Sequence, residues 1–119
     1  MLLEDVEAKL KEIDEKVFYG MVDENEIENE WNYIVFQRKS LSTSDTRQGY
    51  TDRFTVSIIR ENYIPEGLDV EVIDKMREIA GVRLSSSDSP YSYVKKPNTN
   101  TVVELITIEF GRARKRVVT

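Results

Sequence analysis

Arg53-Phe54-Thr55-Val56-Ser57-Ile58 decides the fold, because polar and apolar residues alternate along this stretch without a break. Successive side chains of a β-strand point to opposite faces of the sheet. Phe54, Val56 and Ile58 are therefore expected to face a core, while the polar residues between them face the other way. A sheet with one apolar face needs other elements to cover that face.

The first covering element is predicted near the start of the chain. Apolar residues recur there at spacings of three and four, which predicts an amphipathic helix over about residues 3–15. The stripe consists of Leu3, Val6, Leu10, Ile13 and Val17.

A second helix is expected after the turn formed by Pro65-Glu66-Gly67. Asp69 is its expected cap, and Gly81 is the expected stop signal just after its last apolar residue. The apolar stripe of this helix consists of Val72, Ile73, Met76 and Ile79.

The remaining strands are predicted from short β-branched and aromatic runs. Ile106, Ile108 and Phe110 are expected on one face of the last strand, with Val103 and Leu105 on the other. The acidic residues 23–30 are interpreted as a solvated loop. The strands are predicted over residues 17–22, 31–36, 53–58, 82–84, 91–95 and 101–110.

This order predicts an α+β fold for residues 1–119 as a single domain. Strands joined by short turns run antiparallel, so we expect a mostly antiparallel sheet of about five to six strands. The element order is helix, three strands, helix, then two or three strands. Both helices are expected on one face, which leaves the opposite face exposed.

Two residue types that carry much enzyme chemistry are missing. The chain has no Cys and no His, which excludes disulfides, thiol nucleophiles, common zinc sites and Ser-His-Asp triads. The five glycines are scattered, so no glycine-rich phosphate loop is formed. The acidic cluster at 23–30 lacks the spacing of a calcium loop. We therefore expect no enzyme activity, no metal and no cofactor.

Charge is distributed unevenly along the chain. The formal net charge of -5 argues against sequence-independent nucleic-acid binding by the whole domain. Basic residues gather in 38–49, predicted to be a mobile loop, and in the C-terminal segment 112–119. No apolar run approaches the ~20 residues that cross a bilayer, so no membrane association is expected.

The aromatic residues allow two interpretations. On an exposed sheet they could stack on nucleic-acid bases, but aromatic residues within strands more often pack in a core or against the neighbouring strand. We expect core or cross-strand packing for most of them. They are Trp31, Tyr33, Tyr50, Tyr63, Tyr91 and Tyr93.

Four segments of the chain follow a pattern found in a known group of proteins. They are WNYIVF (31–36), GYTD (49–52), RENYIPEG (60–67) and KPNTNTVVE (96–104). In these segments the chain resembles small phage proteins of the head-tail joining and tail genes, above all the tail terminator, or tail completion, family of long-tailed phages. The resemblance covers nearly the whole chain and rests on overall pattern, since none of its segments is a catalytic signature.

This resemblance implies a structural virion protein, made in the cytoplasm of the bacterial host. Such a protein forms a ring, generally a hexamer, on the head-proximal end of the tail tube and presents a surface to the head connector. Its implied partners are further copies of itself, the tail tube protein and the connector, with DNA only passing through the ring. The expected interface residues are Arg38, Lys39, Arg47, Tyr50, Val103, Leu105, Arg112 and Arg114.

Three alternatives stay open at this point. The chain could be another neck protein, such as a head completion or connector protein. It could be a small nucleic-acid-binding module that uses the basic loop and the C-terminal segment, which salt-dependent retention on DNA would reveal. The third is a soluble enzyme, which a stabilising ligand or metal would reveal. Loop 38–49 could also be a plain solvated connection.

Overall fold

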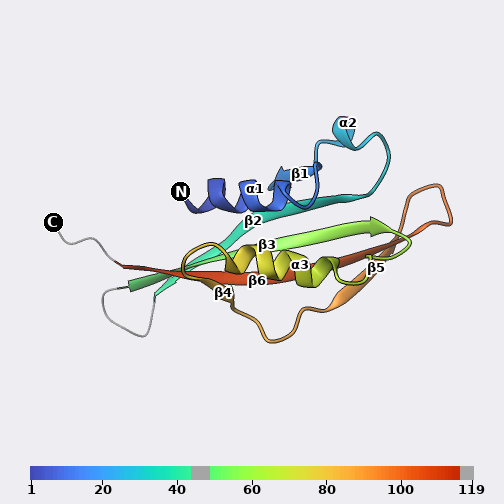
Figure 1. The fold of residues 1–119 in the computed structure, drawn as a ribbon. Helices are drawn as coiled ribbons and strands as arrows, with labels where there is room; N and C mark the ends of the chain where they lie inside the picture. Colours follow the sequence, from blue (N-terminus) through green and yellow to red (C-terminus); the bar gives the residue numbers. More distant parts are fainter. Residues whose placement is uncertain (44–48, 116–119) are drawn as a thin grey trace.

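The computed structural model describes residues 1–43 and 49–115, which form six strands and three helices (Figure 1). No helix among these residues is both long and apolar enough to cross a membrane. In chain order the elements are α1 (Leu2–Lys11), β1 (Val17–Tyr19), α2 (Glu24–Ile27), β2 (Tyr33–Thr43), β3 (Gly49–Glu61), α3 (Leu68–Arg77), β4 (Val82–Leu84), β5 (Tyr91–Lys95) and β6 (Val102–Lys115).

The strands form one sheet in the order β1-β2-β3-β6-β4, and β5 pairs with the opposite end of β6 from β4. Every pairing is antiparallel except that of β1 with β2, which is parallel. The predicted α+β fold with a mostly antiparallel sheet is therefore confirmed. β3 and β6 pair along their whole shared length, so these two long strands form the centre of the sheet.

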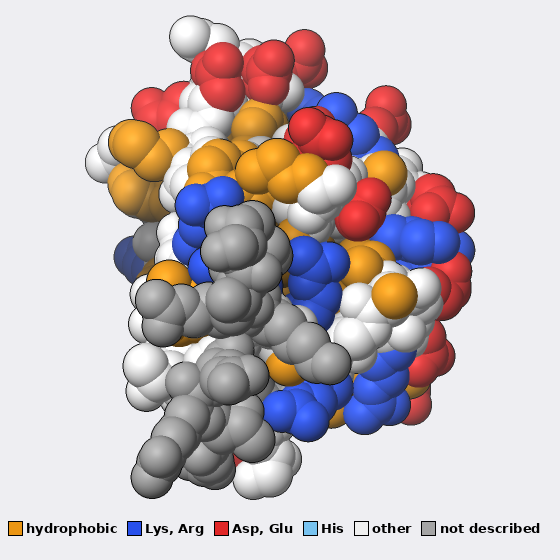
Figure 2. Space-filling model, turned by 90° about the vertical axis from the view of Figure 1, so that its left-hand side faces the viewer, with side chains coloured by type: hydrophobic (Ala, Val, Ile, Leu, Met, Phe, Trp, Pro, Cys, Tyr) orange, Lys and Arg blue, Asp and Glu red, His pale blue; other side chains and the backbone are white. Residues whose placement is uncertain are grey.

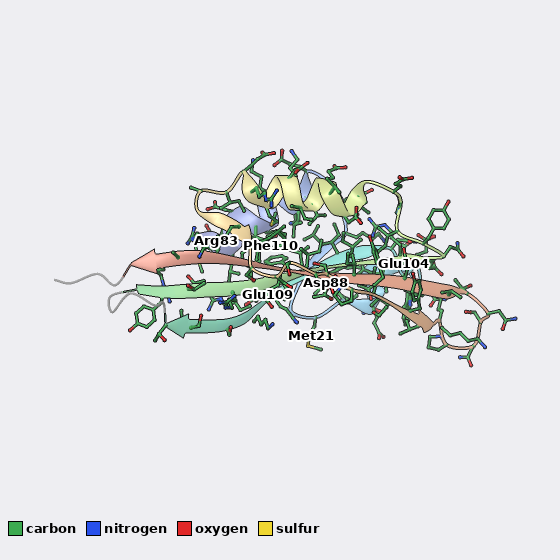
Figure 3. All side chains as sticks on the ribbon, turned by 90° about the horizontal axis from the view of Figure 1, so that it is seen from below. Met21, Arg83, Asp88, Glu104, Glu109 and Phe110 are labelled. Atoms are coloured by element: carbon green, nitrogen blue, oxygen red, sulfur yellow. The ribbon has the colours of Figure 1, made fainter. Side chains whose placement is uncertain are left out.

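The predicted buried face is also confirmed. Helices α1 and α3 lie on the same side of the sheet (Figure 3), and two ion pairs join them, Lys9 Nζ to Glu78 Oε1 at 2.8 Å and Lys75 Nζ to Glu12 Oε1 at 3.3 Å. Their apolar stripes pack on alternate residues of three strands. The sheet residues in this core include Ile34, Phe36, Phe54, Val56, Ile58, Ile106, Ile108 and Phe110.

The boundaries of both α1 and α3 differ from the prediction. α1 ends at Lys11 rather than residue 15, because the Asp14 carboxylate accepts a hydrogen bond from the Lys16 amide at 3.0 Å and turns the chain toward β1. α3 is not capped by Asp69. Its N-cap is Gly67, at a φ of 94° that favours glycine, and Asp69 lies inside the first turn.

The acidic stretch 23–30 is not simply a solvated loop, because it contains the short helix α2. The Asp23 carboxylate accepts a hydrogen bond from the Asn25 amide at 3.0 Å, which caps the helix. Glu28 and Asn29 then adopt positive φ angles of 50° and 62° and end it. Ile27 anchors the segment, since its side chain is buried.

The opposite face of the sheet is partly covered as well, which the prediction of an exposed face missed. Phe18, Ile27, Ile59 and Val103 are buried hydrophobic residues outside the core cluster under the helices. Phe18 pairs with Val35, and Ile59 pairs with a residue of β6. These pairings place Phe18 and Ile59 on the face away from α1 and α3. Met21 also lies on that side of the sheet (Figure 3).

The basic stretches are strands where the structure describes them. Residues 38–43 complete β2 and Gly49 begins β3, so the predicted mobile loop 38–49 is wrong at these positions. Residues 112–115 of the C-terminal basic segment complete β6. The remainder of both stretches, residues 44–48 and 116–119, lies outside the described residues.

Extension of these strands makes the molecule elongated, with extents of 55 × 27 × 23 Å. At one end of the long axis β2, β3 and β6 continue past the helices, and both chain termini lie near that end (Figure 1). At the other end lie the hairpin of β5 and β6 and the connection from β3 to α3. The two ends therefore carry different parts of the sheet.

Candidate functional site

The strand register gathers basic residues from distant parts of the chain at one end of the sheet. Arg38 of β2 pairs with Phe54 of β3, while Arg112 and Arg114 of β6 pair with Asp52 and Tyr50 of β3. Alternation then places all of these side chains on the face that carries the helices. We call this region, with Lys39 and Arg53 beside it, the basic end.

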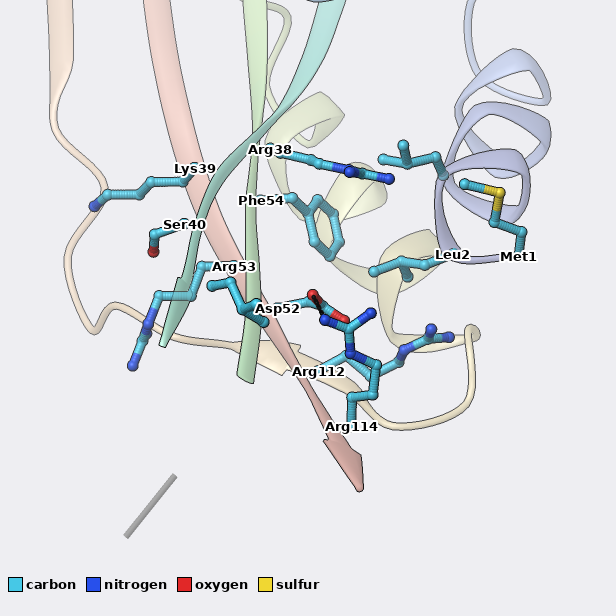
Figure 4. Close-up of a pocket in the computed structure, with 12 residues that line it drawn as sticks. Met1, Leu2, Arg38, Lys39, Ser40, Asp52, Arg53, Phe54, Arg112 and Arg114 are labelled. Atoms are coloured by element: carbon cyan, nitrogen blue, oxygen red, sulfur yellow. Dashed lines mark ion pairs between the residues drawn. The ribbon is translucent and has the colours of Figure 1, made fainter. Parts of the chain in front are cut away.

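A groove of about 420 Å³ opens at the basic end (Figure 4). The start of α1 forms one wall, and β2, β3 and β6 form the other. In the close-up, Arg38 points toward α1, whereas Arg112 and Arg114 lie below it. The apolar residues that line the groove are Met1, Leu2, Leu3, Leu41 and Phe54.

The positive charge of this groove is only partly compensated. Arg114 Nη2 lies 3.5 Å from Asp52 Oδ1, a loose ion pair. Arg38 and Arg112 form no ion pair with any carboxylate in residues 1–43 and 49–114. The space-filling view of this end shows blue Lys and Arg side chains with hydrophobic ones between them, and red acidic side chains mainly toward the rim (Figure 2).

Lys39 and Arg53 project to the other face and have a structural partner. Both form ion pairs with Glu109, Arg53 Nη1 at 3.4 Å, and the Ser85 hydroxyl donates to Glu109 Oε2 at 2.6 Å. The hydrogen bonds from Lys39 and then Ser85 hold the pKa of Glu109 below its usual value. This cluster ties β2, β3 and β6 to the loop after β4.

Ordinary alternation along β2 directs Arg38 to the groove and Lys39 to Glu109 on the far side. A β-bulge then follows, because the register between β2 and β3 shifts between Arg38 and Ser40 and leaves Lys39 without a partner on β3. A bulge adds one residue to a strand and redirects the side chains beyond it. Leu41, which pairs with Asp52, therefore lies on the face of the groove.

Four of the predicted interface residues line this one groove, and the others are placed differently. Arg38, Lys39, Arg112 and Arg114 all belong to its lining. Tyr50 is half-buried and pairs with Arg114. Arg47 lies outside the described residues.

The two apolar residues predicted at the interface are less accessible. Val103 is completely buried within the subunit, and Leu105 is half-buried. The short helix α2 and its anchor Ile27 belong to the structure that covers the sheet face of Val103 and Leu105. The sequence analysis predicted a solvated loop for that stretch. A single isoleucine within an acidic run was the only sequence signal for this cover.

A second, polar groove of about 560 Å³ lies on the face away from the helices. Its lining includes Gln37, Thr55, Thr107 and Glu109. Thr55 is buried and its hydroxyl has no hydrogen-bond partner among the described residues. No group of three or more Asp or Glu residues placed to hold a metal ion occurs in the part of the chain that the structure describes. This groove therefore offers no recognisable chemistry.

Neither a scan against models of protein families nor a search of curated proteins found a match for this chain. The functional interpretation therefore depends on the residues themselves. Among the described residues, the basic end is the region where uncompensated charge, exposed apolar side chains and a groove coincide.

Proposed function

We propose that this chain is a structural subunit of a phage particle of the tail terminator type. In this role it forms an oligomeric ring, generally a hexamer, that caps the head-proximal end of the tail tube and provides the docking surface for the head connector. Its site is an assembly interface, and it turns over no substrate. The subunit would be made in the bacterial cytoplasm and retained in the neck of the virion.

The observation that carries this proposal is the composition of the basic end. Its groove combines exposed arginines with apolar side chains, a mixture that suits a protein partner with acidic and apolar contacts. Charged groups of this kind steer association and fix its register. The segments that resemble tail terminator proteins support placing this interface in a phage particle.

The acidic balance of the chain agrees with a ring through which DNA passes. A net charge of -5 repels phosphates on average, so DNA would not be held in the lumen. The basic residues must then face protein partners rather than the passing DNA. Another neck protein of similar size would satisfy the same reasoning, and its position in the particle would distinguish it.

The basic end also supports a second candidate, a nucleic-acid-binding module. Arg38, Arg112 and Arg114 could contact phosphates, which would make binding fall steeply with salt. Retention of the purified protein on DNA at low salt and its release at moderate salt would favour this candidate. The protein-interface proposal predicts little retention under both conditions.

The direct test is the position of the labelled protein in intact particles. We expect gold-labelled antibody to bind at the head-tail junction in electron micrographs. Labelled protein that stays in the host cytoplasm, or that decorates another part of the virion, would refute the proposal.

A charge-reversal variant tests the role of the basic end itself. Arg38→Glu combined with Arg114→Glu should abolish the joining of heads to tails, because both side chains are exposed and line the groove. Arg83→Glu is the matched control, since Arg83 is an exposed arginine on the opposite face, paired with Gly111. Normal joining with the double variant would remove the basic end from the assembly interface.

A further inference from the structure

The end of the molecule opposite the basic end carries exposed aromatic side chains. Tyr63, Tyr91 and Tyr93 are 70%, 47% and 60% exposed, and Val102 beside them is 47% exposed. Core packing, one of the two arrangements expected for most of the aromatic residues, is therefore wrong for these three tyrosines. We call this group the aromatic end.

The strand residues of the aromatic end lie on the helix side of the sheet. Tyr91 pairs with Ile106 and Tyr93 with Glu104, which places both tyrosines on that face. The Asn62 amide donates to the Val102 carbonyl at 2.6 Å and so brings the loop that contains Tyr63 to the same hairpin. Glu104 lies far along the sheet from Phe110 and Arg83, which are near the basic end (Figure 3).

The hydroxyl groups of Tyr91 and Tyr93 are bound to carboxylates, while about half of each side chain stays exposed. The Tyr91 hydroxyl donates to Asp69, and this hydrogen bond raises the pKa of Tyr91 to about 12. Hydrogen bonding to Glu104 likewise raises the pKa of Tyr93. Glu104 Oε1 in turn accepts the Ile64 amide at 2.7 Å, which fixes the carboxylate beside the ring.

An arginine is the side chain that this combination recognises best. The planar guanidinium stacks on an aromatic face and donates to a carboxylate beside it, which an ammonium group does less well. Rigid tyrosines are also typical of the energetically dominant part of protein interfaces. Lys95 lies on the same face and contributes one opposing charge.

We propose that the aromatic end of one copy receives the basic end of a second copy, in a head-to-tail contact. This inference rests on the proposed function and names the partner of the basic end. The same chain supplies both complementary surfaces: exposed arginines at one end, and exposed rings with fixed carboxylates at the other. The two ends lie apart along the 55 Å axis, so the basic end and the aromatic end of one subunit cannot contact each other. Contacts between unlike surfaces build rings when they close.

Engineered disulfides test this arrangement directly, because the natural chain contains no cysteine. Leu41→Cys places a thiol at the basic end, and Lys95→Cys places one at the aromatic end; both positions are exposed. When the two variants are mixed and oxidised, we expect the mixed disulfide to be the dominant dimer. A disulfide forms only if its two Cα atoms come within about 7 Å, so a mixed product reports the proposed contact.

Sedimentation of cysteine-free variants gives the second measurement. Tyr63→Ser with Tyr93→Ser should remove self-association, whereas Met21→Ser, which removes an 84% exposed residue on the other side of the sheet, should leave it unchanged. Equal association of the double variant and the natural chain overturns the inference. So do dominant Leu41→Cys homodimers, which would indicate contact between like ends, and complete absence of mixed disulfide at high protein concentration.

The two proposals fail in different ways. If the labelled protein is found at the head-tail junction but no mixed disulfide forms, the head-to-tail contact is wrong and the particle role stands. If the mixed disulfide forms but the label never reaches the junction, the chain self-associates as inferred and the particle role is wrong.

Discussion

The same three strands build two regions of opposite character. Under the helices, the inward residues of β2, β3 and β6 are apolar and fully buried, and they end with the stacked rings of Phe54 and Phe110, whose centroids are 5.4 Å apart. Two residues further along, the same face carries Asp52 and Arg112. Strand pairing continues unchanged, so only the residue type marks where the core ends. The basic end is thus a rigid extension of the core that exposes charge.

The core should respond most strongly to mutation. Ile106→Ala is expected to lower the free energy of unfolding by about 2 to 5 kcal/mol, because it leaves a cavity in the packed face. Urea unfolding followed by circular dichroism measures this value. Val102→Ala is the control in the same strand, since Val102 is exposed, and it should cost about 0.5 kcal/mol or less. Similar values for both variants would contradict the assigned core.

The sequence was sufficient to predict the core because alternation and helical spacing report burial directly. Phe54, Val56 and Ile58 in β3, and Ile106, Ile108 and Phe110 in β6, lie where these periods place them. Gly81 adopts a φ of 82° that favours glycine, but its prediction as the stop signal of α3 is wrong, because α3 ends at Arg77 with Glu78 as its C-cap. The periodicity of a single segment is sufficient to predict which of its residues are buried.

The basic end and α2 were harder to predict, because their structure depends on pairing with distant residues. Residues 38–43 have the composition of a loop, yet they pair with the start of β3, and residues 112–115 pair with β3 as well. Pairing of neighbouring strands overrides weak strand propensity at these positions. The sequence predicted four groove residues as an interface but could not show that one groove unites them.

Ion pairs allow a second comparison between the core and the basic end, in which the expected changes in the free energy of unfolding are smaller. Asp14 and Arg60 lie beside the core, with 2.6 Å between Oδ2 and Nη2 and only 14% exposure of either side chain. Asp52 and Arg114 at the basic end are 3.5 Å apart and 25% and 53% exposed. Asp14→Ala should therefore cost about 1 to 3 kcal/mol, because it leaves a largely buried guanidinium unpaired.

Asp52→Ala is the matched variant at the basic end. It should change the free energy of unfolding by less than about 1 kcal/mol, since exposed pairs are weak. Thermal unfolding of both variants under the same conditions gives the comparison. An equal loss for the two would mean that the basic end contributes to the subunit core, contrary to its description as an extension that exposes charge.

The smallest expected effect is a pH dependence of stability, which comes from Glu109 and its partners on the face away from the helices. Hydrogen bonds from Lys39 and Ser85 lower the pKa of Glu109 from its usual 4.5. The unfolded chain therefore takes up this proton at a higher pH than the folded chain does. The stabilisation from Glu109 is complete above the usual pKa and is lost as the pH falls through the lowered value.

Glu109→Gln isolates this contribution. The variant should be less stable than the natural chain at neutral pH, and the difference should shrink as the pH falls from 4.5 through the lowered pKa of Glu109, below which the natural carboxylate is also neutral. Urea unfolding at several pH values measures it. Asp88→Asn is the control, because Asp88 lines the same face but forms no ion pair with the described residues, and its difference should not vary with pH in this way. A Glu109→Gln difference that is constant with pH would mean that the ion pairs of Lys39 and Arg53 do not hold the basic end together. The arginines of the groove would then be positioned by strand pairing alone.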